Sequence, residues 1–263
     1  MERSTNYILI FATAVCFVCS IFVSGAAVAL KDKQDLNKKI DMQKKVLLVA
    51  GILSEGDGVD DSEIPALFEK SIEAKVVDLK TGKISATDPS TYDQLKASKD
   101  PALSIEVNSA AAVAAGVKRV PKEAFVYTSK KDQRLIFPIE GKGLWSTLYG
   151  FLALNSDLNT VEGIIFYQHG ETPGLGGEIE NPRWTALWPG KHLFDAKGKT
   201  AITVVKGQAK AGDPHQIDGL SGATITSRGV SYLVQYWMGE ECFGPYLKSL
   251  GTTKTGMNNG RIR

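Results

Sequence analysis

The stretch Asp218-Gly219-Leu220-Ser221-Gly222-Ala223-Thr224-Ile225-Thr226-Ser227 gathers small and hydroxyl residues directly before an amphipathic segment. Four apolar residues then follow at helical spacing, namely Val230, Leu233, Val234 and Trp237. This stripe predicts a helix with one apolar face. Asp218 and Ser221 are of types that commonly cap helix N-termini. The free N–H groups at such a start favour an anion, and phosphate is the usual one. A well-capped helix without a ligand fits the same pattern.

The residues from Asp218 to Thr224 resemble the covalent flavinylation motif Asp-x-x-Ser-Gly-Ala-Thr. In that motif the last threonine carries FMN through a phosphoester, so the resemblance makes Thr224 the acceptor. It also implies that the neighbouring residues surround the cofactor, namely Ser221, Gly222, Ala223 and Thr226.

Three further blocks make nearly the whole chain similar to the C subunit family of the Na+-translocating NADH:quinone oxidoreductase. They occur in family order: Val18-Cys19-Ser20 with Val23-Ser24-Gly25-Ala26-Ala27, then Gly143-Leu144-Trp145-Ser146, then His169-Gly170-Glu171-Thr172-Pro173-Gly174-Leu175-Gly176-Gly177. The resemblance implies a membrane-anchored flavoprotein subunit that relays electrons within a Na+-pumping complex and is not catalytic alone.

The resemblance also implies the partners. They are the other membrane subunits of the complex and a separate Mg²⁺-dependent flavin transferase, for which this chain is the substrate. Two alternatives stay open at this point. One is the G-type flavinylated subunit of an RNF electron-transport complex, which shares Ser-Gly-Ala-Thr but is usually shorter; the long segment over residues 31–120 argues against it. The other is a membrane-anchored scaffold module without a cofactor.

Composition excludes several other classes of protein. The chain has 263 residues and a net charge of +2, so the balance of charge gives no sign of a nucleic-acid partner. Its three cysteines cannot form a disulfide framework. Cys16 and Cys19 form a C-x-x-C within an apolar segment, where packing against a neighbouring helix explains them better than a metal site, because further ligands are missing nearby. We therefore expect no metal site.

Residues 7–30 contain no charged side chain, and about 24 residues give roughly 36 Å of helix, enough to cross a bilayer. A cleaved signal peptide has a shorter apolar region and a more basic start, so we expect a retained single-pass anchor. Six lysines follow the span and only Arg3 precedes it, which by charge alone places the following domain in the cytoplasm. The resemblance instead implies the bacterial inner membrane with a periplasmic domain.

The chain divides into five expected parts: an N-terminal tail at 1–6, a transmembrane helix at 7–30, a helical stalk with the first part of the soluble region at 31–120, an FMN-binding domain at 121–250, and a flexible tail at 251–263. Alternating and β-branched patterns predict strands at 75–79, 124–128, 134–139, 160–169 and 200–205, with a helix before the first of them at 65–74. We expect an α+β protein whose sheet is mostly antiparallel and flanked by helices.

Two glycine-rich segments are candidates for the walls of the cofactor site. The first, at 141–150, holds Trp145 and Leu148 between hydroxyl residues, where an exposed indole can face a planar ring. The second, at 169–179, fails both nucleotide-loop patterns, because Ile179 and Glu178 stand where a glycine and a lysine are needed. The resemblance places three of its residues at the flavin, namely Glu171, Thr172 and Leu175, with Glu171 bonding ring or ribityl groups.

Overall fold

The computed structural model describes residues 4–259, and the side chains of residues 4–251. The chain forms two units, residues 1–43 and 44–263, the second of which is called the body below. Helix α1 (Thr5–Val49) makes up the first unit and continues into the second. Over residues 7–30 its side chains are all exposed. Within the described part of the chain, α1 is the one helix long and apolar enough to cross a membrane.

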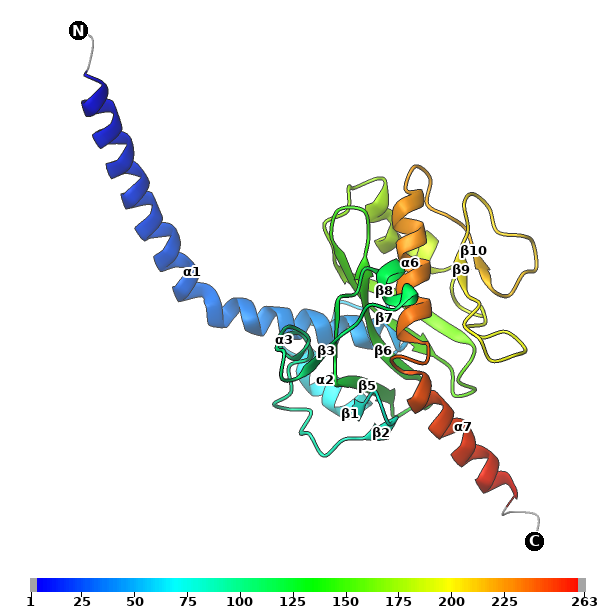
Figure 1. The fold of residues 1–263 in the computed structure, drawn as a ribbon. Coiled ribbons are helices and arrows are strands. Elements are labelled where there is room, and N and C mark those ends of the chain that lie inside the picture. Colours follow the sequence, from blue (N-terminus) through cyan, green and yellow to red (C-terminus); the bar gives the residue numbers. More distant parts are fainter. Residues whose placement is uncertain (1–3, 260–263) are drawn as a thin grey trace. The chain divides into compact units, whose positions relative to one another are not determined.

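The body is built on a six-stranded sheet in the order β2-β1-β5-β6-β7-β8, with every neighbouring pair antiparallel (Figure 1). Its strands are β1 (Ile72–Asp78), β2 (Lys83–Ile84), β5 (Glu123–Ser129), β6 (Leu135–Lys142), β7 (Thr147–Leu154) and β8 (Val161–Gln168). Two ribbons accompany the sheet, antiparallel β3 (Ser104–Glu106) with β4 (Arg119–Pro121), and parallel β9 (Thr203–Val204) with β10 (Gln216–Ile217). The predicted fold class, a mostly antiparallel sheet flanked by helices, is confirmed.

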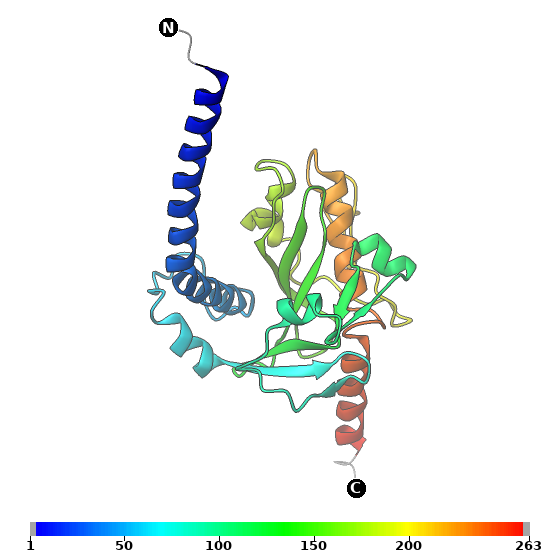
Figure 2. The same cartoon turned by 60° about the vertical axis from the view of Figure 1, so that its left-hand side comes forward.

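Helices cover both faces of this sheet. On one face lie α6 (Thr224–Trp237) and, beside it, α4 (Ala110–Ala115) (Figure 2). The four stripe residues of α6 are fully buried there, as their spacing predicts: Val230, Leu233, Val234 and Trp237. The shorter helices are α2 (Ile64–Ser71), α3 (Gln94–Lys99), the 3-10 helix η1 (Gly176–Glu180) and α5 (Pro182–Thr185).

The opposite face is packed with aromatic rings. Phe68 of α2 meets Tyr127 of β5 edge-on, with ring centroids 5.9 Å apart, and Tyr127 meets Phe151 of β7 at 6.1 Å. Val49 at the end of α1 reaches Gly163 of β8. The last turn of α1 therefore belongs to the core of the body.

The structure departs from the sequence-based expectation in four places. Strand β7 was not predicted, because residues 141–150 were considered only as a glycine-rich candidate for a wall of the cofactor site. Helix α2 ends at Ser71 and β1 begins at Ile72, both earlier than predicted. The strand predicted at 200–205 is observed only as the two residues of β9, Thr203–Val204. Residues 87–120, for which no structure was predicted, form α3, β3, α4 and β4.

At the C-terminus, helix α7 runs over Gly244–Asn259. The expected tail at 251–263 overlaps its end, and residues 260–263 of that tail lie outside the described part of the chain. Residues 1–3 of the expected N-terminal tail lie outside it as well.

Candidate functional site

Three segments singled out in the sequence lie at the same end of the body (Figures 1 and 2). They are the turn at residues 143–146, the loop at 169–177 that follows β8, and the start of α6. The turn joins β6 to β7: Lys142 pairs with Thr147, and the N–H of Gly143 donates to the carbonyl of Ser146 at 2.8 Å. We call this turn, this loop and residues 221–226 the three-segment site.

A single buried carboxylate joins the three segments. Oε1 of Glu171 accepts the N–H groups of Trp145 at 2.9 Å and Ser146 at 3.4 Å. Its Oε2 accepts the N–H of Leu144 at 3.2 Å and the hydroxyl of Thr226 at 2.6 Å. The loop thus holds the turn on one side and the first turn of α6 on the other.

The hydrogen bonds to Glu171 stabilise its charged form. Burial by itself raises the pKa of this carboxyl, but the bond from Thr226 and those from the N–H groups of Trp145, Leu144 and Ser146 outweigh burial. The pKa of Glu171 therefore lies below its ordinary value, and the carboxylate is ionised at neutral pH.

The two threonines of the motif differ in accessibility. Thr226 is fully buried, and its hydroxyl is engaged by Glu171. Thr224 is half-buried, and its hydroxyl forms no hydrogen bond within the part of the chain that the structure describes. Of the two hydroxyls, the one on Thr224 is open to a reagent from outside.

The start of α6 is not capped as the sequence predicts. The N-cap position is Ala223, without a side-chain bond to the helix, so the prediction of Asp218 or Ser221 as the cap is wrong. The Asp218 carboxylate is instead engaged by the N–H of Ala209 at 2.7 Å, and Ser221 is exposed. A helix start that its own side chains leave uncapped keeps N–H groups available to an external anion.

Each of the three segments also carries an exposed apolar side chain. They are Trp145 (71% exposed), Leu175 (44%) and Ile225 (56%), and Leu144 (41%) adds a fourth. Cδ2 of Leu175 lies against Gly222, which has a φ of +71°. Ile225 and Leu144 were not among the predicted site residues. For Ile225, its place outside the buried stripe of the same helix was the available signal.

The remaining predicted site residues have varied environments. Leu148 is fully buried beneath the turn, so the structure does not bring it to the exposed surface. Thr172 is exposed, and its carbonyl accepts the N–H groups of Leu175 at 3.1 Å and Gly177 at 3.0 Å, which closes the loop tightly. Ala223 is buried, with 6% of its surface exposed.

His169 supports the loop from within the body. Its Nδ1 accepts the N–H of Glu171 at 3.1 Å, and its Nε2 lies 3.2 Å from Oε1 of Glu180, outside good hydrogen-bond geometry. These contacts are those of a residue that supports the loop structurally.

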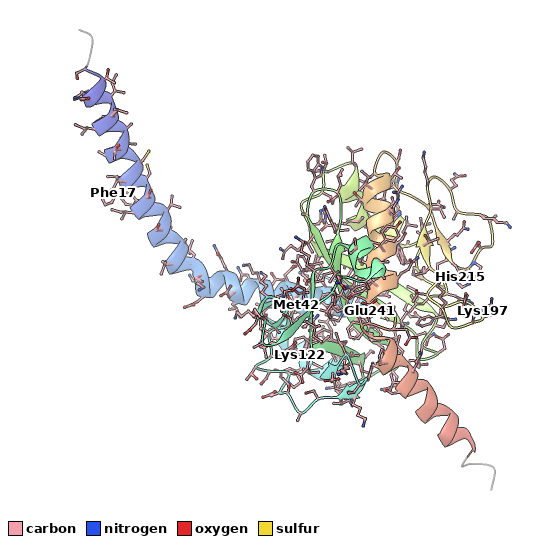
Figure 3. The ribbon with its side chains drawn as sticks, in the orientation of Figure 1. Phe17, Met42, Lys122, Lys197, His215 and Glu241 are labelled. Carbon is pink, nitrogen blue, oxygen red and sulfur yellow. The ribbon has the colours of Figure 1, made fainter. Side chains whose placement is uncertain are left out.

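A cavity of about 740 Å³ lies elsewhere in the body. Its lining includes Lys197, Tyr236 and Glu241, near the C-terminal end of α6, and contains no residue of the three-segment site (Figure 3). The three-segment site is therefore an exposed apolar rim beside a free hydroxyl and unbonded N–H groups. Such a surface fits a planar ring system that carries a phosphate.

Comparison with known proteins agrees with this geometry. Residues 143–239 match the FMN-binding domain family, and this range contains all of the three-segment site. The chain is 50% identical over 256 residues to the C subunit of the Na(+)-translocating NADH-quinone reductase of Pseudomonas aeruginosa, covering 95% of this chain and 97% of that protein. The crystal structure of Shewanella oneidensis NqrC has a TM-score of 0.74 and 37% identity, covering 82% of this chain and 99% of that one. The crystal structure of the same subunit from Parabacteroides distasonis has a TM-score of 0.65 and 28% identity, covering 83% and 96%.

Proposed function

The chain belongs to the C subunit family of the Na(+)-translocating NADH-quinone reductase, and on that premise we propose that Thr224 carries FMN as a phosphoester and that the chain relays electrons within the complex. Family membership makes the chain a membrane-anchored flavoprotein subunit of a sodium-transporting oxidoreductase, with the other subunits as its partners. The family predicted from the sequence blocks is confirmed.

Accessibility is the observation that supports Thr224 as the acceptor. An acceptor hydroxyl must be reached by the enzyme that modifies it, and Thr224 is half-buried with an unbonded hydroxyl. Thr226 is unsuited, because it is fully buried and donates to Glu171. Ser221 is exposed but precedes the helix, so its hydroxyl is not on the first helical residue.

The start of α6 supplies the electrostatic part of the site. A phosphate on Thr224 lies next to the unbonded N–H groups of the first turn and at the positive end of the helix dipole. At a partly exposed position this interaction contributes about 0.3–1 kcal/mol. The helix start therefore orients the attached group and adds modestly to its stability.

The exposed apolar rim forms a wall of the proposed flavin site. Trp145, Leu175 and Ile225 project from three different segments, so they can contact both the edge and the face of a ring system held at Thr224. When bound, FMN supplies the redox chemistry of the protein. The residues of this chain hold the flavin, exclude water from part of its surface and fix its place in the complex.

Attachment requires a second enzyme, which we propose is a Mg²⁺-dependent flavin transferase acting on this chain. The Oγ of Thr224 attacks the FMN phosphorus of FAD, an O–P bond forms, the pyrophosphate bond breaks, and AMP leaves. The threonine proton passes to a base of the transferase, and no net oxidation occurs. The exposed residues Ser221, Gly222 and Ile225 beside the half-buried Thr224 suit such a reaction, since the transferase must approach the acceptor closely.

The test is to coexpress the full-length chain with a flavin transferase and measure its intact mass. We expect the wild-type chain to gain one FMN in ester linkage, and Thr224→Ala to gain none while keeping the thermal stability of the wild type. Thr226→Ser, which retains the hydroxyl that bonds Glu171, is the matched control and should still be flavinylated. Fluorescence of the denatured band under ultraviolet light gives an independent readout. A flavin adduct on Thr224→Ala would refute the assignment of the acceptor.

A further inference from the structure

Glu171 has more contacts within the protein than a cofactor ligand needs. We propose that Glu171 is a positioning residue: its carboxylate joins the 143–146 turn to the first turn of α6, and it does not itself bind the flavin. This role rests on the proposed function, since the site it organises is the one around Thr224. It replaces the expectation that Glu171 bonds ring or ribityl groups.

The hydrogen bonds of the Glu171 carboxylate support the proposal. A carboxylate has about four lone-pair positions. In Glu171 they are met by three backbone N–H groups and the hydroxyl of Thr226. Only 5% of the residue is exposed. No acceptor site of the carboxylate is left for a ligand.

Close packing around the carboxylate supports the same role. A Cβ at Gly143 would lie 2.6 Å from Oε1, and a Cβ at Gly176 would lie 2.6 Å from Oε2 and 2.8 Å from Oγ1 of Thr226. The two glycines belong to two different segments, and at both the carboxylate of Glu171 is the group that a Cβ would meet first. The backbone is therefore shaped around Glu171 from two sides.

The contacts of Glu171 determine the position of the exposed apolar rim. Trp145 is 71% exposed, so its place depends largely on the backbone of its turn. That backbone is held by Glu171 through the N–H groups of residues 144–146. The same carboxylate holds Thr226, two residues after the acceptor. Glu171 thus fixes the position of the wall relative to Thr224 before any flavin arrives.

The first experiment uses the unflavinylated full-length chain in detergent and needs no cofactor. Backbone hydrogen exchange is measured for residues 144–146 in the wild type and in Glu171→Gln. A glutamine keeps the shape, but its NH₂ group must face N–H donors, so at least one backbone bond is lost. We expect exchange of this turn to become about tenfold faster, equivalent to about 1.4 kcal/mol of lost protection. Glu178→Gln, in η1 directly after this loop and outside these contacts, should leave the rate unchanged.

The second experiment uses the flavinylated chain and reads the visible circular dichroism of the bound flavin. Thr226→Val removes one partner of Glu171 without touching the carboxylate, and we expect it to weaken the signal at least twofold, as Glu171→Gln does. Thr226→Ser should restore it. This series keeps the test valid should Glu171→Gln fail to fold.

The outcomes are separable. Unchanged exchange of residues 144–146 in Glu171→Gln would overturn the proposal. So would a flavin spectrum altered by Glu171→Gln but untouched by Thr226→Val, since that pattern marks a direct ligand. If the wild-type chain carries no flavin, the proposed function fails, whereas the exchange experiment still decides whether Glu171 holds the turn.

Discussion

At the scale of single residues, two carboxyl groups of the body have opposite environments. Glu171 is surrounded by donors, which hold its pKa below the ordinary value although burial opposes this. Glu140, in β6, is largely buried, and no hydrogen bond reaches its carboxyl within the described residues. Burial raises the pKa of Glu140 to about 7, with Lys99 partly opposing the shift. The number of hydrogen-bond donors at a carboxyl group, more than the depth of its burial, decides whether its pKa is lowered or raised.

The raised pKa of Glu140 predicts a pH-dependent loss of stability. The unfolded carboxyl ionises near 4.5, whereas the folded one stays protonated up to about pH 7. Between these values the folded state holds a proton that the unfolded state has lost, so stability falls as pH rises. Above pH 7 the destabilisation is complete and amounts to at most about 3 kcal/mol.

Glu140→Gln should therefore stabilise the body at pH 8 by on the order of 1–3 kcal/mol and have little effect at pH 4.5. The backbone carbonyl of residue 140 accepts the indole N–H of Trp237, and the substitution keeps that bond. Urea unfolding of wild type and variant at the two pH values checks this. Equal stabilisation at both values would show that the charge of Glu140 is not the cause.

At the scale of elements, the packing of α6 on the sheet depends on two glycines. A Cβ at Gly141 of β6 would lie 2.5 Å from Cβ of Leu233, and a Cβ at Gly229 of α6 would overlap the backbone carbonyl of Lys142. Neither glycine has a positive φ. Their role is therefore close approach between helix and strand, next to the turn that carries Trp145.

Gly229→Ala should destabilise the body by on the order of 1–3 kcal/mol, because the added methyl group pushes α6 away from β6. In an open helix the same change is stabilising, by up to about 1 kcal/mol. Gly251→Ala in α7, where a Cβ meets nothing within 4 Å, is the matched control and should be neutral or stabilising. Thermal melts of the three proteins decide the matter. A Gly229→Ala variant as stable as the wild type would mean that the helix can shift freely.

Periodic patterns predicted the elements that sit in the core. The apolar stripe of α6 is fully buried as expected, and the strand predicted at 160–169 is observed as β8, Val161–Gln168. In both cases burial of one face dictates the spacing of apolar residues, so the pattern is visible in the chain itself.

Strand β7 and the end of β6 were not predicted, because the glycines there carry no local sign of their purpose. Gly141 of β6 and Gly150 of β7 lie within strands, where Leu233 and Phe166 leave no room for a side chain. The predicted N-cap of α6 was wrong for a similar reason. The Asp218 carboxylate accepts the N–H of Ala209, a contact that only the tertiary fold creates.

The residues that form the site could be predicted from the sequence, but the separate role of each residue could not. The motif and the two glycine-rich segments do meet in space. However, Leu148 is covered by the turn and Glu171 is saturated with internal bonds, and both facts depend on long-range contacts. Ile225 went unnoticed because its exposure, not its type, makes it part of the rim.

At the scale of the whole molecule, one helix carries the chain from an apolar segment into the core of the body. Residues 7–30 of α1 have no charge and are exposed, whereas Val46, Leu47 and Val49 at its end are buried. The body contains one cysteine, the buried Cys242, so it depends on no disulfide and can fold in either compartment. The side of the membrane on which it resides must be decided by other arguments.

Two arguments about orientation disagree. Lysines at six positions after the span favour a cytoplasmic body by charge count: Lys31, Lys33, Lys38, Lys39, Lys44 and Lys45. However, long domains that follow a span translocate largely regardless of charge. A covalent bond to the flavin is also most useful where lost cofactor cannot be replaced, which is outside the cytoplasm. We therefore propose a periplasmic body.

This orientation predicts the behaviour of two fusions to the C-terminus of the chain. A fusion to alkaline phosphatase, which requires an oxidising compartment, should be active. A fusion to green fluorescent protein, exported by the same route, should not fluoresce. Replacing the six lysines by glutamine separates the two arguments. If the long domain dominates, phosphatase activity is unchanged by this substitution. If charge dominates, the wild-type phosphatase fusion is inactive and gains activity when the lysines are removed, which would place the natural body in the cytoplasm.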